Sequence, residues 1–394
     1  MRKDLLEIFL CPNHHMDGFI VFAYELKRGN QLLSNVDHDQ IQDKDDVRTG
    51  FVIGNKSRSV YPITEYILSA LSDEAADYEL YISLLNSALE YSPPRYRSTI
   101  QENIERIRQC SPEQSGDWNR DEMQYYDRAV EAEVQRKAFC EKIKKEPLWH
   151  IYIERERYLL RDLFLPDCCN VLEIGCGNAR TVAWLFQPRK NSYNYIGTDI
   201  SLKRLLLAKM VIPEGDFVQC SALNLPFRDE TFSAVFSFGV LHHLENPLQG
   251  AQVCLSKLRK GGYFLIHEPI EKPKKLLPKG KLEFMHKILE TYNHSEHDNH
   301  IDVKNILRLF EVHKSTVQRM HFNASALRTV VSRIFAFIPK INKSERAWKF
   351  LIAADRTFIK LFCFKPNRFG PGGVFVRFKK ECLSSNYFQP DRQA

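Results

Sequence analysis

The chain has 394 residues, 44% of them hydrophobic, and a net charge of +7 at pH 7. This length and composition predict a substantial buried core and two domains. The sequence holds no run of 18 or more apolar residues and no charged-then-apolar leader, so it predicts neither a membrane span nor a secretion signal, and we expect a cytoplasmic protein. Its ten cysteines are scattered without a Cys-x-x-Cys pair, so we expect no disulfide framework.

Residues 1–71 are predicted to form a small unit of their own, which resembles a zinc-ribbon-like domain. A structural zinc requires four nitrogen or sulfur ligands, normally in two pairs. Cys11 with His14 or His15 could form one pair, but the stretch before Tyr61 offers no thiolate or imidazole. We therefore expect a ribbon-like fold that has lost its metal, and a filled zinc site is the alternative.

Residues 72–149 are predicted to be mainly helical. Apolar residues recur at three- and four-residue spacing in the stretch 75–85, and Pro93 and Pro94 break that pattern. Long segments rich in Glu, Arg and Lys follow. We expect a helical linker that leads into the main domain.

A glycine-containing stretch, Asn170–Ala179 (NVLEIGCGNA), follows the linker. An apolar strand runs into Gly175 and Gly177, where the missing side chains let the backbone pass close to a ligand. A second strand ends 22 residues after Gly177 in Asp199, whose carboxylate can accept hydrogen bonds from ribose hydroxyls. The dinucleotide fingerprint needs a third glycine where this chain has Arg180, which disfavours hydride transfer. The pattern is typical of a site for S-adenosylmethionine.

Three further motifs complete a resemblance to the class I S-adenosylmethionine-dependent methyltransferases, particularly the subgroup with Leu-Pro-Phe and Leu-His-His signatures. They are 225–227 (LPF), 241–243 (LHH) and a Gly-Gly turn at 261–262 before an apolar strand. The motifs stand in the expected order and cover residues 150–270. The alternative is an α/β domain whose glycines serve only as turns.

This resemblance implies an α/β, Rossmann-like, seven-stranded methyltransferase sheet with helices on both faces, and S-adenosylmethionine as the cofactor. Ribbon-like domains of the kind suggested for 1–71 elsewhere act as activating partners of several methyltransferases, or are fused in front of others. The implied cofactor-binding residues are Tyr126, Glu173, Gly175, Cys176, Gly177, Asp199, Ile200, Ser221, Ala222, Ser237 and Phe238.

Tyr126 and Ser221 from this set, and Ser233 outside it, carry particular expectations. Tyr126 lies in a stretch that resembles the segment folded over the cofactor in many of these enzymes, where it could cover the sulfonium by cation–π attraction; a surface or core tyrosine is the alternative. Ser221 stands where the family often has an acid for the adenine amino group, and Ser233 where it often has aspartate. A serine can still hydrogen-bond, so we expect altered cofactor affinity rather than its loss.

Four polar side chains are candidates for the acceptor side of the site. His267 and Glu268 follow the fifth strand, at the edge of a parallel sheet where ligands bind. A histidine near its ordinary pKa of about 6.5 suits a general base. The candidate catalytic residues are His242, His243, His267 and Glu268. For each of them the alternative is a structural role, as a turn cap or packed beneath the site.

Three histidines at positions 294, 297 and 300 suggest a metal site, but the Asn, Ser and Asp residues around them indicate a turn-rich loop. We favour a polar substrate-entry loop and predict no metal. Methyl transfer to a good nucleophile needs none, because proximity to the sulfonium supplies much of the catalysis.

The positive charge is concentrated near the end of the chain. Residues 325–380 contain thirteen Lys or Arg and two acids. Two stretches there place apolar residues on one helical face and basic residues on the other, which is typical of membrane-surface or partner-binding helices. The alternative is an ordinary pair of helices whose basic face is in water. The stretch 373–379 alternates as a half-exposed strand does, so 322–370 would be a helical insertion before the last strand.

The resulting prediction has four parts: a degenerate ribbon-like domain (1–71), a helical linker and cofactor-covering segment (72–149), a methyltransferase domain (150–380) and a tail (381–394). The predicted reaction is methyl transfer from S-adenosylmethionine to a small-molecule, glycan or lipid-linked acceptor, with peripheral contact to an anionic membrane through 325–380 left open. RNA or ribosome-associated methylation is the first alternative, although no nucleic-acid-binding module is found. An inactive cofactor-binding scaffold is the second.

Overall fold

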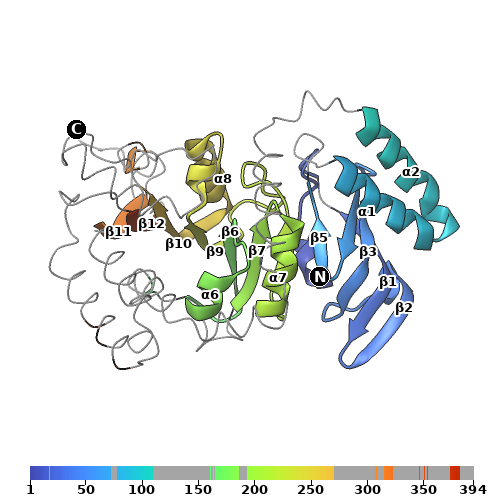
Figure 1. Cartoon of the computed structure of the whole chain (residues 1–394), viewed down its shortest axis with the longest axis horizontal. Helices are drawn as coiled ribbons and strands as arrows, with labels where there is room; N and C mark the ends of the chain where they lie inside the picture. Colours follow the sequence, from blue (N-terminus) through green and yellow to red (C-terminus); the bar gives the residue numbers. More distant parts are fainter. Residues whose placement is uncertain are drawn as a thin grey trace, which may run out of the picture.

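The computed structural model describes residues 1–16, 18–71, 78–109, 165–185, 193–269, 315–322 and 373–381, with a few single positions between them. These residues form one twelve-stranded sheet with helices packed on it (Figure 1). The strand order is β11-β12-β10-β9-β6-β7-β8-β5-β4-β3-β1-β2. The predicted seven-stranded sheet is therefore corrected to a larger one, of which it is one part.

Seven strands come from residues 169–380. They are β6 (Cys169–Ile174), β7 (Tyr193–Asp199), β8 (Asp216–Gln219), β9 (Phe232–Phe238), β10 (Leu258–Pro269), β11 (Ser315–Phe322) and β12 (Gly373–Lys380). The neighbouring strands β10, β9, β6, β7 and β8 pair in parallel, in that order. β12 runs antiparallel between β10 and β11. Residues 323–372 connect β11 to β12, which are neighbours in the sheet.

Helices cover both faces of this part of the sheet, as predicted. Alternate strand residues point to opposite faces. Val171 packs in the same core cluster as α7 (Leu202–Val211), whereas Leu172 packs in the cluster that contains α8 (Pro247–Lys257). The short helix α6 (Arg180–Leu185) follows the glycine loop. The carboxyl ends of β6 to β9 are thus held between two helical layers.

The first 71 residues supply the other five strands. They are β1 (Phe19–Arg28), β2 (Gln31–Asp37), β3 (Asp46–Gly54), β4 (Val60–Thr64) and β5 (Ile67–Ser69), with short 3-10 helices at Lys3–Glu7, η1, and His38–Gln40, η2. β5 pairs in parallel with β8. The four residues of β8 are buried, and an unpaired buried strand would leave backbone donors and acceptors without partners. The unit predicted to stand alone is therefore joined to the main sheet.

Two helices pack on the N-terminal strands, beside β1 and β3 (Figure 1). They are α1 (Tyr78–Tyr91) and α2 (Pro94–Gln109), and they meet at the predicted proline break. Proline is tolerated in the first turn of a helix because its missing N–H has no intrahelical acceptor there. Tyr81 on α1 donates to the carbonyl of Val60 at 3.2 Å, which ties the helix to β4.

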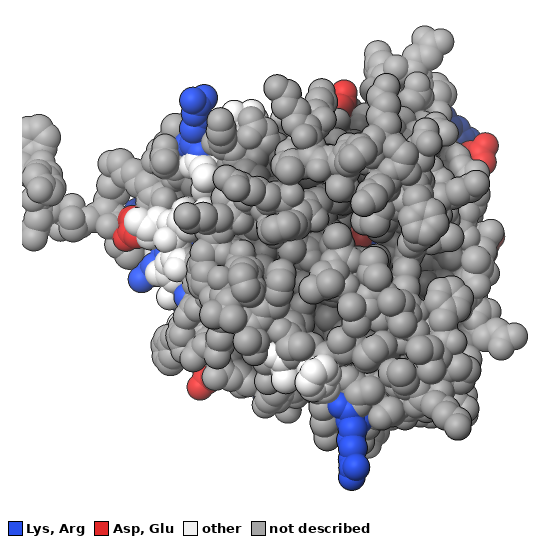
Figure 2. All heavy atoms as spheres, turned by 60° about the vertical axis from the view of Figure 1, so that its left-hand side comes forward, with Lys and Arg blue, Asp and Glu red and all other residues white. Residues whose placement is uncertain are grey.

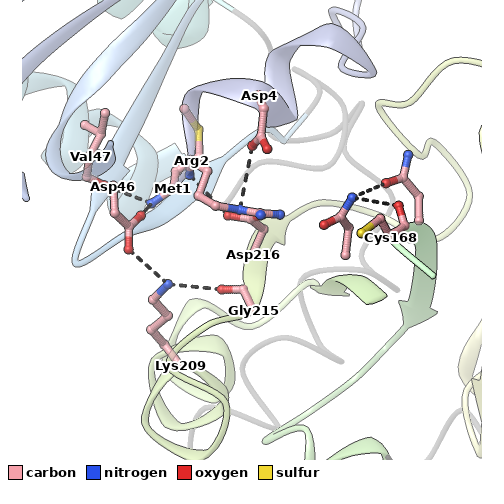
Figure 3. A network of polar contacts seen from close by, with 11 residues as sticks. Met1, Arg2, Asp4, Asp46, Val47, Cys168, Lys209, Gly215 and Asp216 are labelled. Atoms are coloured by element: carbon pink, nitrogen blue, oxygen red, sulfur yellow. Dashed lines mark hydrogen bonds and ion pairs between the residues drawn. The ribbon is translucent and has the colours of Figure 1, made fainter. Parts of the chain in front are cut away.

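Ion pairs also join the two parts of the sheet (Figure 3). Arg2 contacts Asp216 of β8 at 2.7 Å, and Lys209 of α7 contacts Asp46 of β3 at 3.5 Å. The Asp216 side chain is 1% exposed, and it also accepts from the backbone N–H of Arg2 at 3.1 Å. The contact is therefore sequestered from water on the carboxylate side.

We expect Asp216→Ala to lower the free energy of unfolding by about 2 kcal/mol or more, because it leaves the half-buried Arg2 charge with only the longer, 3.6 Å contact to Asp4. Glu102→Ala is the matched control. It removes the pair between Arg58 and Glu102, whose side chains are 58% and 60% exposed, and we expect about 0–1 kcal/mol. Urea unfolding of the full chain measures both, and equal losses would contradict a structural role for the Arg2–Asp216 pair.

The basic helices predicted between β11 and β12 lie outside the described residues. On the face drawn in Figure 2, the described residues form only small separate patches. Their surface character stays a prediction. No helix in the described part of the chain has the length and apolarity that a bilayer crossing requires.

Candidate active site

A pocket of about 630 Å3, including its open mouth, lies at the carboxyl ends of the parallel strands. This is the edge at which open α/β sheets bind ligands. The lining residues are Gly175, Thr198, Asp199, Ile200, Arg204, Cys220, Ser221, Ala222, Gly239, Val240, His243 and Leu244. They come from the ends of β6 to β9 and the first turn of α7.

The glycine loop after β6 forms the floor of this pocket. Gly175 has a φ of +53°, and a Cβ atom there would lie 2.5 Å from Cγ2 of Val240. Gly177 also has a positive φ, +54°, and its N–H donates to Oδ2 of Asp199 at 2.8 Å. Side chains are therefore excluded at Gly175 both by the backbone conformation and by the wall opposite.

Asp199 lies at the end of β7 and lines the pocket as predicted for a ribose acid. Its Oδ2 accepts from Gly177, and its Oδ1 accepts from the N–H of Ser201 at 2.9 Å. Burial raises the pKa of this carboxyl, while Arg204 and the backbone donors act in the opposite direction. Each carboxylate oxygen has two lone pairs, so both keep capacity for a ligand hydroxyl. Binding of ribose stays a prediction.

Ile200, Ser221 and Ala222 also line the pocket. The Ser221 hydroxyl accepts from the N–H of Leu223 at 3.2 Å, which fixes the turn after β8, and its own proton can still be donated.

Glu173 was predicted to reach the cofactor, but it does not line this pocket. Its side chain accepts from the Tyr195 hydroxyl at 2.5 Å, and the residue is 3% exposed. Burial raises the pKa of Glu173 to about 8, although the Tyr195 bond lowers it, so the group is mainly neutral at pH 7. A neutral acid places no second negative charge near Asp199.

The other predicted cofactor residues lie around the pocket without lining it. Cys176 is buried and would contact a Cβ atom added at Gly197, at 2.9 Å. Gly177 acts through Asp199, and Ser237 donates to Glu268 at 3.0 Å. Phe238 stacks on Phe236. Tyr126 lies outside the described residues.

The four candidate catalytic residues lie near one another, but only His243 reaches the pocket. His242 is buried, with its ring 3.8 Å from that of His243 and its Nδ1 2.7 Å from Oε2 of Glu268. His267 stacks on Phe375, and its carbonyl accepts from the N–H of Gly239 at 2.7 Å. Glu268 is fully buried. Direct contact of His242, His267 or Glu268 with an acceptor stays a prediction.

Several lining residues were not predicted from the sequence, among them Arg204, Val240 and Leu244. Arg204 is the third residue of α7, in the first turn of a helix that is N-capped by Ser201 and could have been recognised from the sequence. Val240 directly precedes the motif at 241–243, but nothing in its residue type marks it as a pocket wall. Its position follows from contacts made by β10.

The N-terminal unit is linked to the pocket lining by two hydrogen bonds. The Ser69 hydroxyl of β5 donates to Oε1 of Gln219 at 2.8 Å, and Nε2 of Gln219 donates to the carbonyl of Ile200 at 3.0 Å. Both side chains are buried, with Ser69 and Gln219 each 0% exposed. The strand added at the sheet edge thus positions one residue of the pocket lining.

In the described residues no group of three or more His, Cys, Asp or Glu side chains could hold a metal. Cys11 lies 3.2 Å from Nδ1 of His14 and 2.9 Å from the hydroxyl of Tyr61. Burial raises the pKa of the thiol, but the hydrogen bonds from Tyr61 and His14 outweigh it and lower the pKa to about 7. The histidine-rich stretch 294–300 lies outside the described residues.

Comparison with known proteins finds matches to the region that contains the pocket. The model of the methyltransferase domain family matches residues 172–266. The chain is 33% identical over 99 residues to a tRNA (carboxymethyluridine(34)-5-O)-methyltransferase of Saccharomyces cerevisiae, which covers 24% of this chain and 34% of that protein. It is 32% identical over 96 residues to a phthiotriol/phenolphthiotriol dimycocerosates methyltransferase of Mycobacterium tuberculosis, covering 24% of this chain and 35% of the relative.

The matches thus span only about a third of the length of these curated relatives. Among solved structures, a putative sarcosine dimethylglycine methyltransferase from Galdieria sulphuraria superposes with a TM-score of 0.40 and 15% identity, covering 58% of this chain and 86% of that chain.

Proposed function

We propose that this chain, whose residues 172–266 are a methyltransferase domain with S-adenosylmethionine as cofactor, transfers a methyl group to an acceptor bound next to His243. The observation that supports the proposal best is the pocket itself. A glycine floor that would be filled by a Cβ atom and a carboxylate with unused lone pairs at the next strand end suit an adenosine with a bulky sulfonium chain.

The residues have distinct parts in this proposal. Asp199 would accept from the ribose hydroxyls, and the turn at Ser221 and Ala222 would hold the adenine. S-adenosylmethionine, when bound, supplies an electrophilic methyl carbon, which the lone pair of an acceptor attacks as the carbon–sulfur bond breaks. His243, which lines the pocket, would take the proton of a hydroxyl or amine acceptor.

For the acceptor, we propose a small molecule, a glycan or a lipid-linked intermediate. The relative from Mycobacterium tuberculosis carries a lipid-type acceptor in its name, and no nucleic-acid-binding module is found in the sequence. Methylation of tRNA is the second candidate, because the yeast relative and a probable tRNA methyltransferase 9B of Mus musculus carry that acceptor in theirs. A cytoplasmic location and contact of 325–380 with anionic membranes stay predictions.

Cofactor binding is tested by calorimetry with S-adenosylhomocysteine. We expect binding by the full chain and no binding of NAD. Asp199→Ala is expected to weaken affinity by roughly 10- to 150-fold, the loss of about 1.5–3 kcal/mol typical of hydrogen bonds to a charged group. Asp229→Ala is the control, since that carboxylate pairs with Lys257 away from the pocket. Unchanged affinity in Asp199→Ala would contradict its assigned contact.

The acceptor is tested by transfer of radiolabelled methyl groups from S-adenosylmethionine to separated cell fractions. Label in the lipid or small-molecule fraction supports the first candidate, and label in purified tRNA supports the second. Cofactor binding without transfer to any fraction would favour the scaffold alternative. In each case Asp199→Ala should transfer in proportion to its reduced cofactor occupancy.

A further inference from the structure

Glu268 makes an unusual set of contacts for a residue at the end of a strand. Its Oε1 accepts from the Ser237 hydroxyl at 3.0 Å and from the N–H groups of Val240 and Leu241 at 3.0 and 2.9 Å. Its Oε2 lies 2.7 Å from Nδ1 of His242. All of these partners belong to β9 or to the turn that follows it, residues 239–243, whereas Glu268 belongs to β10. One carboxylate therefore holds a whole turn of the neighbouring strand.

That turn is a wall of the pocket. Gly239, Val240 and His243 line it, and Val240 stands directly over Gly175. The N–H groups of Val240 and Leu241 precede or begin the short helix η4 (Leu241–His243), so they have no intrahelical acceptors. Glu268 supplies the missing acceptor from the adjacent strand. The position of His243 relative to the glycine floor thus depends on a side chain that does not itself reach the pocket.

The same contacts argue against proton transfer by Glu268. The carboxylate is fully buried, and the donors that surround it occupy both of its oxygens. Burial raises the pKa of Glu268, but the bonds from His242 and the backbone outweigh it and leave the pKa below its usual range. An ionised carboxylate accepts only, so the proton of the 2.7 Å contact resides on Nδ1 of His242.

We infer that Glu268 is a positioning residue, which fixes the turn 239–243 so that Val240 and His243 form the wall of the cofactor and acceptor pocket. The inference rests on the proposed function for what the pocket binds. The part of the inference that concerns the turn is independent of the proposed function, because Glu268 orders the turn whether or not a ligand is present.

Two substitutions separate positioning from acid–base catalysis. Glu268→Gln removes the charge but keeps an oxygen at the place of Oε1, and its amide can donate to Nδ1 of His242 when the ring carries its proton on Nε2. Glu268→Asp keeps the charge but draws the carboxylate back by one methylene, away from the backbone donors. Positioning therefore predicts that Gln preserves the turn and the cofactor affinity better than Asp, whereas a carboxylate that acts only in proton transfer predicts that neither substitution changes them.

The test measures S-adenosylhomocysteine affinity by calorimetry and amide hydrogen exchange of Val240 and Leu241 in the full chain. We expect affinity at least tenfold weaker in Glu268→Ala and Glu268→Asp, with faster exchange at both amides. Glu268→Gln should stay within threefold of the unsubstituted protein, with its amides protected. Glu245→Ala is the matched control: this carboxylate is exposed just after the same turn, and its removal should change neither quantity.

The outcomes are separable. Slow exchange at Val240 and Leu241 in Glu268→Ala, or affinity lost in Gln and kept in Asp, would overturn the inference. If the unsubstituted protein does not bind S-adenosylhomocysteine, the proposed function fails, and the exchange rates still decide whether Glu268 orders the turn. Should Glu268→Ala not fold, the ranking of Gln and Asp decides in its place.

Discussion

Gly175→Ala is expected to weaken S-adenosylhomocysteine binding at least ~100-fold, about 2.7 kcal/mol. The new methyl group would lie 2.5 and 2.6 Å from the two Cγ atoms of Val240, whose branched side chain has little rotamer freedom to yield. Val240 cannot retreat easily either, because its N–H is held by Glu268 at 3.0 Å. Overpacking of this kind costs roughly 1–3 kcal/mol in stability, and the left-handed backbone of Gly175 adds about 1–2 kcal/mol for a residue with a Cβ.

Gly29→Ala is the matched control for that substitution. Gly29 has a similar φ of +57°, in the turn between β1 and β2, but a Cβ atom there would meet nothing within 4 Å. It should share the backbone cost and lose no affinity. Calorimetry and urea unfolding of both variants isolate the steric term, and equal affinity in the two variants would show that the glycine floor does not meet the ligand.

The central strands and the pocket edge could be predicted from the sequence because their signals are local. Apolar runs that end in Gly175 and Asp199 mark where two parallel strands stop, and both residues line the pocket. The alternation of residues 373–379 also predicted a last strand, which the structure has as β12. These features need only residue type, spacing and the known edge at which such sheets bind ligands.

The remaining features depend on contacts between distant segments. Nothing in the sequence of β5 marks Ser69 as a partner for Gln219, 150 residues later. Glu268 is polar and stands at a strand end, so it was predicted to be catalytic, yet its five contacts all go to the neighbouring strand and turn. The same pattern of residues supports both roles, and only the direction of the side chain separates them.

Glu173, on β6, is a second residue whose contacts could not be predicted from its residue type and position in the sequence. Its place in the glycine motif predicted a cofactor contact, which stays a prediction; in the structure its carboxyl accepts from the hydroxyl of Tyr195. Removal from water favours the protonated form, and the nearby charge of Asp199 adds to that effect. A residue identified by its motif thus has a physical role that can be measured without any acceptor.

Glu173→Gln is expected to stabilise the protein, increasingly so as the pH rises. Burial raises the pKa of Glu173 from its ordinary 4.5 to about 8, so the folded state binds a proton that the unfolded state releases. The stability linked to this group is fully present below pH 4.5 and is lost as the pH rises through 8. Glutamine keeps an acceptor for the Tyr195 hydroxyl and does not titrate. At about 1.4 kcal/mol per pH unit, the advantage of the variant should grow by roughly 4 kcal/mol between pH 5 and pH 8.

Urea unfolding at several pH values, without ligand, measures this difference. Glu102→Gln is the control, since that carboxylate is 60% exposed and its removal should shift stability by a small amount that changes little over the same range. If unfolding free energies of Glu173→Gln and the unsubstituted protein ran parallel from pH 5 to pH 8, Glu173 would have to be ionised in the folded state. The buried carboxylate would then lie close to that of Asp199, and the Tyr195 hydroxyl would have to offset its desolvation alone.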